Sequence, residues 1–116
     1  MCARFDIVTI FPSIINAYLG ESILKRAVQN GRLDVKVHNL RDYTTDKHRT
    51  VDDYPYGGGS GMVMKIEPMY NALMTIGADG EERRKILLSP QGRTYNQAIA
   101  EEFSRDGRRI LLVCGR

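Results

Sequence analysis

The stretch Phe5–Phe11, which reads Phe-Asp-Ile-Val-Thr-Ile-Phe, decides the fold class that we predict for this chain. β-branched and aromatic residues dominate it, and they do not alternate with polar residues as they do in a strand with one solvated face. Such a run is typical of a parallel strand that is covered on both sides. Pro12 and Ser13 follow directly and offer the start of a helix.

Strands and helices alternate along the rest of the chain. Helical spacing predicts a helix that ends at Asn30-Gly31, and the alternation from Leu33 to His38 predicts a half-buried strand. A charged surface loop is expected over Ala78–Lys85. The other expected elements are a short strand at Met62–Met64, a helix from Glu67 to Gly77 with Met69, Leu73, Met74 and Ile76 in the core, a buried strand at Ile86–Leu88, a helix at Asn96–Phe103 and a buried strand at Ile110–Cys114. We therefore predict an α/β protein with a mostly parallel sheet and flanking helices, in a strand order that cannot be derived.

The composition is that of an ordinary globular domain. The 116 residues suit one domain, with 42% hydrophobic and 27% charged residues. Its apolar runs are too short to span a membrane, and its first residues lack the pattern of a signal peptide. Two distant cysteines suggest no disulfide framework, so we expect a cytoplasmic protein. The net charge of +3, from 17 basic and 14 acidic residues, gives weak support for a nucleic-acid partner.

The most unusual local feature is Tyr54–Gly61, which reads Tyr-Pro-Tyr-Gly-Gly-Gly-Ser-Gly. Four glycines in five positions permit positive φ angles and a close approach to a ligand. The segment is neither a P-loop nor a dinucleotide fingerprint, because the required Gly-Lys-Ser/Thr and strand–turn–helix context are absent. Tyr54 and Tyr56 favour stacking on bases. A flexible surface loop explains the glycine content equally well.

The segment Asn39–Gly61 as a whole shows no period, and we expect it to be irregular and mobile in the absence of RNA. Its part from Arg41 to Asp53 is about neutral in charge, which argues against a simple phosphate-binding patch. Asp52 and Asp53 either accept hydrogen bonds from a base edge or cap a turn. His48 is a conceivable general base, with an ordinary surface histidine as the alternative. The spacing of histidines and cysteines fits no metal site.

Two further segments follow the carboxyl ends of predicted strands, where ligands bind in open parallel sheets. They are Ser89-Pro90-Gln91-Gly92-Arg93 and Gly115-Arg116. Backbone groups of the first segment suit an adenine edge or a ribose, and a tight turn is an adequate structural explanation of the same residues.

Taken together and in order, these segments closely resemble the bacterial tRNA (guanine-N1)-methyltransferase family, commonly called TrmD, of the SPOUT superfamily. Each matching stretch is short, but their joint order and spacing is specific, and they extend over nearly the whole chain. The matching stretches are Phe5–Pro12, Asn39–Tyr43, Asp46–His48, Thr50–Tyr56 with the glycine loop to Met62, Ser89–Arg93 and Val113–Arg116.

The resemblance implies an α/β fold whose C-terminal part threads a trefoil knot, and a homodimer with its active site across the interface. It implies S-adenosylmethionine as methyl donor and N1 of the guanine 3′ of the anticodon as acceptor. Asp52 and Gly61 match positions that contact the target base and anticodon loop, whereas Tyr54 and Ser60 fall where the family varies. The positions matching the cofactor loops are Leu87, Leu88, Ser89, Pro90, Gly92 and Gly115.

Methyl transfer to N1 of guanine requires a base that removes the N1 proton while the methyl group is held in line. The family uses an aspartate, with an arginine nearby, and both lie beyond residue 116. The family pattern also continues from Gly-Arg into Tyr-Glu-Gly. We therefore expect residues 1–116 to be the N-terminal part of the methyltransferase domain, with an incomplete knot and without the C-terminal tRNA-binding domain. Alone, this chain is expected to be inactive and to bind S-adenosylmethionine weakly.

Two alternatives remain open at this point. One is a non-catalytic RNA-binding remnant of the enzyme, which a stop codon after Arg116 would favour. The other is a different α/β methyltransferase or nucleotide-binding enzyme. That class predicts a glycine-rich turn directly after the first strand, which Phe11-Pro12-Ser13 does not provide.

Overall fold

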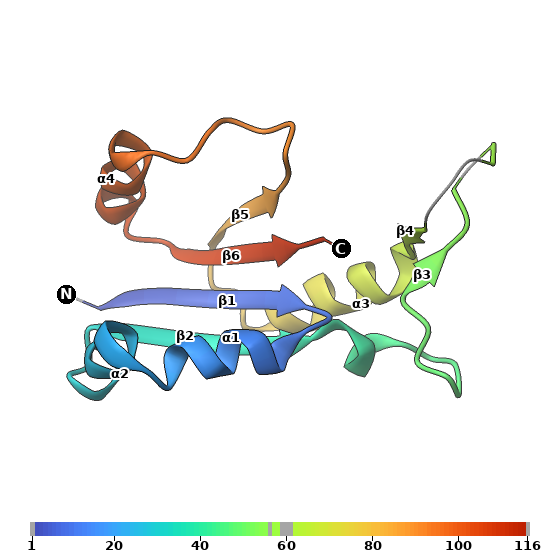
Figure 1. The fold of residues 1–116 in the computed structure, drawn as a ribbon, viewed down its shortest axis with the longest axis horizontal. Helices are drawn as coiled ribbons and strands as arrows, with labels where there is room; N and C mark the ends of the chain where they lie inside the picture. Colours follow the sequence, from blue (N-terminus) through green and yellow to red (C-terminus); the bar gives the residue numbers. More distant parts are fainter. Residues whose placement is uncertain (1, 56, 59–61, 116) are drawn as a thin grey trace.

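A four-stranded parallel sheet is the main element of the computed structural model, which describes residues 2–55, 57–58 and 62–115 (Figure 1). The strand order is β2-β1-β6-β5, and every neighbouring pair is parallel. The mostly parallel α/β class predicted from the sequence is therefore confirmed. The strands of this sheet are β1 (Ala3–Thr9), β2 (Leu33–Asn39), β5 (Arg83–Leu88) and β6 (Arg109–Cys114), and a separate antiparallel pair consists of β3 (Asp52–Asp53) and β4 (Val63–Met64).

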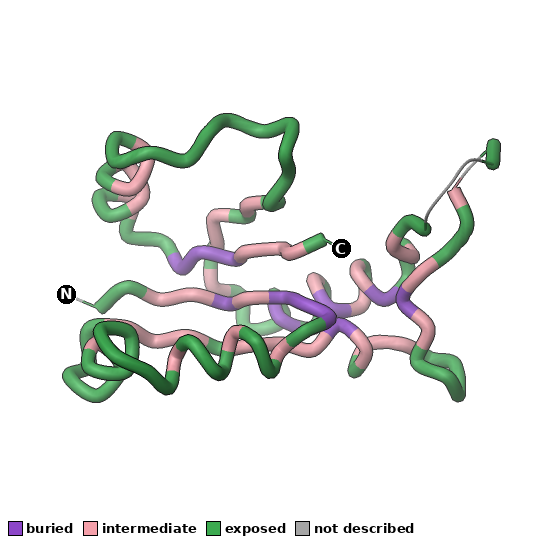
Figure 2. Tube along the Cα trace, in the orientation of Figure 1, coloured by how far each residue is buried: buried purple, intermediate pink, exposed green. Residues whose placement is uncertain are grey.

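Burial follows the position of each strand in the sheet (Figure 2). On the central strands β1 and β6, Val8 is 0% exposed and Leu111 is 1% exposed. Strand β5 lies at the edge, and its Leu87 and Leu88 are 68% and 51% exposed. The prediction of a buried strand at Ile86–Leu88 is thus correct for the strand and wrong for these two side chains. Periodicity within a segment does not reveal whether another element covers it.

The connection from β1 to β2 holds two helices, α1 (Pro12–Leu19) and α2 (Ser22–Gln29), where the sequence suggested one. Gly20 ends α1, and Ser22 has a φ angle of 52°, so the helical path is interrupted between them. The predicted stop at Asn30-Gly31 is confirmed, because Gly31 has a φ angle of 71°. Within the described residues, no helix has the length and apolarity that crossing a membrane requires.

Helix α3 (Ile66–Ile76) packs on one face of the sheet, and it lies behind the sheet in Figure 1. Ala72 and Ile76 are buried in the core, and Met69 and Leu73 pack against it. Met74 is 58% exposed, which contradicts its predicted core position. The reason is helical geometry: two residues beyond Ala72, a side chain points to the opposite side of the helix. The core cluster consists of Val8, Ile10, Leu40, Val51, Ala72, Ile76 and Leu111.

The segment Ala78–Lys85 is more ordered than the surface loop that we predicted. A short 3-10 helix, η2 (Gly77–Asp79), follows α3, and β5 already begins at Arg83. Charged residues start this strand because they have partners: Arg84 pairs with Glu102 and Asp106 of α4 (Gln97–Asp106). Helix α4 begins at a side-chain cap, in which Asn96 accepts a hydrogen bond from the Ile99 N–H.

A network of charges lies buried in the sheet around Asp6, whose exposure is only 1%. Asp6 Oδ2 accepts hydrogen bonds from Arg83 Nε at 2.8 Å and Arg109 Nε at 2.6 Å. Its Oδ1 lies 2.8 Å from His38 Nε2. Burial by itself would raise the pKa of Asp6, but the hydrogen bonds from Arg83, His38 and Arg109 bring that pKa below its ordinary value. One carboxylate thus joins β1 to β2, β5 and β6.

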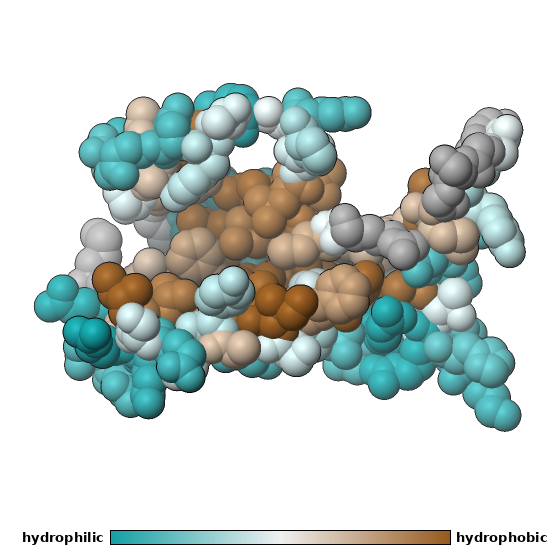
Figure 3. Space-filling model, viewed as in Figure 1, coloured by the Kyte–Doolittle hydropathy of each residue, from teal (hydrophilic) through white to brown (hydrophobic). Residues whose placement is uncertain are grey.

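The face opposite α3 carries an apolar hollow of about 600 Å³ (Figure 3). Phe5, Ile110 and Leu112 of the sheet form part of its floor, and Ala100 and Phe103 of α4 form part of its wall. Alternation along β6 explains this arrangement, because Leu111 faces α3 while its two neighbours face the hollow. The described residues thus leave an apolar surface uncovered on this face of the sheet.

Candidate cofactor and RNA site

Two of the predicted ligand segments meet at the carboxyl edge of the sheet. Strands β5 and β6 pair in parallel, and their last residues, Leu88 and Cys114, are register partners. Ser89 and Gly115 therefore begin their loops at adjacent positions. This is the edge at which parallel α/β sheets bind ligands.

The loop after β5 is a tight turn with its own internal hydrogen bonds. Ser89 Oγ accepts a hydrogen bond from the Gln91 N–H at 3.1 Å, and the Ser89 carbonyl accepts one from the Gly92 N–H at 3.3 Å. Within the described residues, the six positions predicted to bind the cofactor are all exposed, so a ligand can reach them. Those positions are Leu87, Leu88, Ser89, Pro90, Gly92 and Gly115.

The two glycines of these loops are not required by the packing of the chain itself. A Cβ on Gly92 would lie 3.6 Å from the Ser89 carbonyl, an ordinary contact, and a Cβ on Gly115 would meet nothing within 4 Å. Neither residue has the positive φ angle that favours glycine. Both glycines instead leave space beside the backbone, which is the shape needed where a ligand approaches the main chain closely.

The glycine segment belongs to the β3–β4 hairpin, in which Asp52 pairs with Met64 and Asp53 pairs with Val63. Gly57 and Gly58 have φ angles of 80° and 88°, so the positive φ angles expected from the sequence are confirmed at these two positions. The hairpin lies at the end of the molecule toward which β1 and β6 run (Figure 1). Gly61, which we predicted to contact RNA, lies outside the described residues, as do Tyr56 and Ser60.

Asp52 is half-buried on β3, and its neighbour Asp53 is exposed. The Oδ1 atom of Asp53 accepts a hydrogen bond at 2.8 Å from the N–H of the next residue, Tyr54, and the turn-capping role suggested by the sequence stays a prediction. The predicted contact of Asp52 with a base is not tested by this arrangement and stays a prediction.

The segment that leads into the hairpin is not irregular throughout, contrary to our expectation. It begins with a 3-10 helix, η1 (Leu40–Tyr43), and the side-chain amide of Asn71 in α3 donates a hydrogen bond to the Tyr43 carbonyl at 3.2 Å. Arg49 Nε donates to the Arg41 carbonyl at 3.2 Å. Polar side chains that gave no period in the sequence thus satisfy backbone groups of this loop. His48 lies exposed, as an ordinary surface histidine does.

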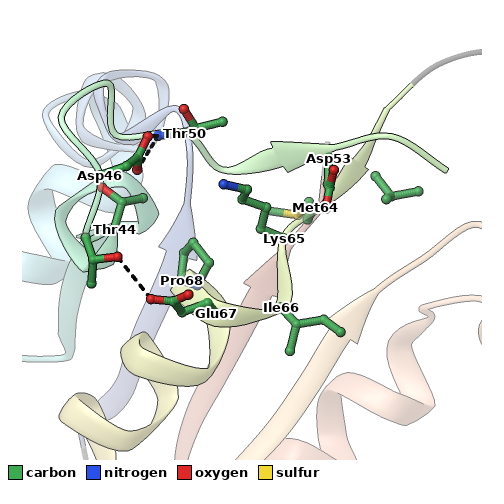
Figure 4. A pocket seen from close by; sticks show the side chains of 11 residues that line it. Thr44, Asp46, Thr50, Asp53, Met64, Lys65, Ile66, Glu67 and Pro68 are labelled. Carbon is green, nitrogen blue, oxygen red and sulfur yellow. Dashed lines mark hydrogen bonds between the residues drawn. The ribbon is translucent and has the colours of Figure 1, made fainter. Parts of the chain in front are cut away.

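A second hollow, of about 340 Å³, lies at the base of the hairpin (Figure 4). No motif in the sequence indicated it, because its walls come from the loop before β3, from β3 and β4, and from the first turn of α3. The walls of this hollow, which we call the hairpin pocket, are Thr44, Thr45, Asp46, Thr50, Asp53, Val63, Met64, Lys65, Ile66, Glu67 and Pro68.

A parallel sheet with flanking helices and two open loops at one carboxyl edge defines an α/β protein of the kind that binds nucleotide-like ligands at that edge. Comparison with known proteins identifies the family within this class. The model described as tRNA (Guanine-1)-methyltransferase TrmD matches residues 3–116. The chain belongs to this family, whose members are S-adenosylmethionine-dependent methyltransferases.

Individual relatives agree with the family model. A tRNA (guanine-N(1)-)-methyltransferase of Dictyoglomus turgidum is 55% identical over 113 residues, which cover 97% of this chain and 45% of that protein. The corresponding protein of Chloroflexus aggregans is 50% identical, with 97% of this chain and 44% of that protein covered. The chain therefore spans about half the length of the curated relatives that it matches.

A solved structure confirms the fold. The crystal structure of tRNA (m1G37) methyltransferase from Aquifex aeolicus superposes with a TM-score of 0.88 at 36% identity. The match covers 100% of this chain and 52% of that structure. This share agrees with the expectation that the chain holds an N-terminal portion of the family's fold, in which the knot is incomplete.

Proposed function

We propose that residues 1–116 form the N-terminal part of a SPOUT methyltransferase domain, and that the whole protein is a tRNA (guanine-N1)-methyltransferase. Its substrate is N1 of the guanine 3′ of the anticodon, and its C-terminal tRNA-binding domain lies outside this chain. One observation carries the proposal within the family: the pairing of Leu88 with Cys114 brings the loops at Ser89 and Gly115 together at one sheet edge.

The cofactor of this reaction is S-adenosylmethionine, which supplies the methyl group when bound. Open space beside Gly92 and Gly115 fits a ligand that approaches the backbone closely. The loop N–H and C=O groups bind the polar edges of the adenosine moiety, and the exposed side chains of Leu87 and Leu88 provide apolar contact. The six proposed cofactor residues are Leu87, Leu88, Ser89, Pro90, Gly92 and Gly115.

The tRNA contacts of this chain lie on the β3–β4 hairpin. We assign the contact with the target base and anticodon loop to Asp52 and Gly61. A carboxylate on β3 is an acceptor for the N–H groups of a guanine edge. Gly57 and Gly58 adopt positive φ angles that favour glycine, and the absence of side chains at these two residues lets an RNA strand approach the backbone closely.

The protein acts as a cytoplasmic homodimer with its active site across the interface. The apolar hollow beside α4 supports this assembly, and so do the apolar side chains of α1. Ile14 and Tyr18 of that helix are 53% and 68% exposed. An uncovered apolar surface of this kind marks a protein contact. Residues 1–116 alone lack the catalytic aspartate, so this chain by itself transfers no methyl group.

The experiment uses protein expressed from the complete reading frame. We expect that frame to continue with Tyr-Glu-Gly, and its product to methylate a tRNA transcript with guanine, but not adenine, 3′ of the anticodon. Calorimetry should show S-adenosylmethionine binding to that product and much weaker binding to residues 1–116. A stop codon after Arg116 would support the non-catalytic RNA-binding remnant instead.

A matched pair of glycine variants tests the cofactor loop. Gly92→Ala and Gly77→Ala both add a Cβ where the chain has room for it, at φ angles that alanine tolerates. Gly92→Ala should weaken S-adenosylmethionine binding by about tenfold or more, because only the ligand competes for that space. Gly77→Ala, which lies at the end of α3, should leave the affinity unchanged. Equal affinities of the two variants for S-adenosylmethionine would show that Gly92 does not belong to the cofactor site.

A further inference from the structure

The loop after β5 has two ends, and they are held in different ways. Strand β5 pairs with β6 through Leu88 and Cys114, which fixes the first end. The second end enters α4, and the segment between the two ends forms a long arch in Figure 1. Every residue in the range 87–98 is exposed, so burial does not hold this segment in place. The direction in which residues 89–93 point therefore depends on where α4 lies.

Two consecutive arginines at the start of β5 face opposite sides of the sheet, because side chains alternate along a strand. Arg83 points into the buried network and donates to Asp6 at 2.8 Å. Arg84 points to α4, where its Nη1 donates to Asp106 at 2.7 Å and its Nη2 donates to Glu102 at 2.9 Å. These two carboxylates lie about one helical turn apart, so Arg84 holds two successive turns of α4.

The guanidinium group of Arg84 also packs on an aromatic ring of α4. Its central carbon lies 4.5 Å from the centre of the Phe103 ring, within the range of a cation–π contact. The Phe103 ring in turn contacts the ring of Tyr95, at 6.3 Å between centres and 40° between planes. Tyr95 belongs to the arch and directly precedes Asn96, the cap of α4. Arg84, Phe103 and Tyr95 thus form a continuous stack that leads from the sheet to the far end of the loop.

Hydrogen bonds inside the loop do a different job from this stack. Ser89 accepts them from the Gln91 and Gly92 N–H groups, and they set the shape of the turn. Both partners of each bond lie within the turn, so these bonds do not fix its place relative to Gly115. Binding a ligand through backbone groups requires a fixed place as well as a fixed shape.

We propose that Arg84 is a positioning residue for S-adenosylmethionine that acts through Phe103 and Tyr95 on the loop at residues 89–93. The proposal rests on the proposed function in taking this loop as part of the cofactor site. Arginine suits the role better than lysine, because a planar guanidinium stacks flat on a ring while its N–H groups reach two carboxylates. Arg84 stands at the start of β5 and the loop follows its end, so Arg84 acts without touching the ligand.

The test compares Arg84→Met with Arg108→Met in protein expressed from the complete reading frame. Arg108 pairs with the same Asp106, with its Nε at 2.6 Å, but it lies beyond the end of α4. Arg84→Met should weaken S-adenosylmethionine binding about tenfold in calorimetry, because the loop loses its second anchor. Arg108→Met should leave the affinity unchanged, and Arg84→Lys should recover part of the loss. An unchanged affinity in Arg84→Met, or an equal loss in Arg108→Met, would overturn the proposal.

A second measurement needs no cofactor. Hydrogen exchange followed by NMR reports how often the Gly92 N–H loses its bond to the Ser89 carbonyl. This amide should exchange several-fold faster in Arg84→Met, and at the wild-type rate in Arg108→Met. Phe103→Leu, which keeps an apolar side chain but removes the ring, should also speed the exchange. Wild-type exchange in both Arg84→Met and Phe103→Leu would show that the stack does not hold the loop, and would overturn the proposal.

The outcomes separate the role of Arg84 from the proposed function. A wild-type protein that binds no S-adenosylmethionine would overturn the proposed function, and this role with it. Equally tight binding by the wild-type protein and by Arg84→Met would overturn only the role of Arg84.

Discussion

The parallel sheet and the β3–β4 hairpin are held together by different means. In the sheet, side chains such as Val8 and Leu111 are almost completely buried, and Asp6 joins four strands through hydrogen bonds. The hairpin pairs only two residues on each strand, and Val63 and Tyr54 are 46% and 80% exposed. The sheet therefore supplies the stability of the domain, while the hairpin is free to serve a ligand.

This difference separates fold from function within one chain. Asp52, which we assign to RNA, is half-buried, and the residues of the buried core are not assigned to any ligand. Substitutions of the same kind in the two regions should thus have unequal effects on stability. Three of the four predictions below pair a change in the sheet, or at the end of α4, with a matched change in the hairpin, and the other one follows the sheet as the pH falls.

The largest effect is expected from Asp6→Ala, paired with Asp53→Ala in the hairpin. Removing the Asp6 carboxylate leaves Arg83 and Arg109 buried without their shared partner, which should cost about 3–5 kcal/mol. Asp53 is exposed, and the hydrogen bond that it accepts within the described residues comes from the neighbouring Tyr54 N–H, so its loss should cost less than about 1 kcal/mol. Urea unfolding measures both. Equal costs would show that the buried network does not stabilise the sheet more than a surface hydrogen bond stabilises the hairpin.

The second largest loss of stability is expected from truncating a side chain of the core. Leu111→Ala removes a side chain that is 1% exposed and should cost about 2–5 kcal/mol, because it leaves a cavity against α3. Val63→Ala, at a position that is 46% exposed, should change the free energy of unfolding by less than about 1 kcal/mol. Thermal or urea unfolding of the two variants distinguishes them. A Val63→Ala variant as unstable as Leu111→Ala would mean that the hairpin belongs to the core.

Lowering the pH should destabilise the sheet. The pKa of Asp6 is below its ordinary value in the folded protein. The ionised Asp6 carboxylate therefore makes its full contribution to the free energy of unfolding above that ordinary value, near pH 4. It is lost as the pH falls through the lower, folded-state pKa. The free energy of unfolding should thus be steady from about pH 7 to 5 and decline below about pH 4. Asp6→Asn should show a weaker decline, and an unchanged acid profile for that variant would contradict the assignment.

The smallest difference is expected for two glycines with positive φ angles. Gly107 ends α4 at a φ angle of 79°, and Gly58 lies in the hairpin at 88°. Alanine at Gly107 should cost about 1–2 kcal/mol of global stability. The same strain at Gly58 should lower the melting temperature less, because the hairpin is able to rearrange without unfolding the sheet. A Gly58→Ala variant with the lower melting temperature would reverse this ranking.

Local sequence patterns predicted the strands of the sheet and its flanking helices well. They failed for side-chain exposure and for pairing between distant residues, which depend on tertiary contacts. The run Phe5–Phe11 indicates a buried parallel strand, and its part up to Thr9 lies in β1 at the centre of the sheet, whereas Phe11 is 52% exposed and precedes α1. The exposure of Leu87 and Leu88 depends on which strand occupies the edge, which no local pattern encodes. Asp6 interrupts an apolar strand, and that single acidic residue was the available signal for the buried network. Its partners Arg83 and Arg109 are 77 and 103 residues away in sequence.

The candidate site, too, has one part that the sequence predicts and one part that it does not. The position of the two loops that we propose for the cofactor was predictable, because a loop that follows a parallel strand lies at the carboxyl edge wherever the strand stands in the sheet. The hairpin pocket was not, because Asp46 and Lys65 come together only when the loop before β3 packs beside the start of α3. Lys65 follows the short strand β4 and belongs to no recognisable motif, so the sequence around it gives no sign of a pocket.

Asp6 also restricts which arrangements of the strands are possible. Its two oxygens meet donors from β2, β5 and β6 only when those strands stand in their observed order and register. A slip of one residue in β6 would turn Arg109 to the opposite face and leave the carboxylate with one donor fewer. The buried charge thus penalises misaligned sheets, and the loops that begin at Ser89 and Gly115 stay side by side because Leu88 and Cys114 are held in register.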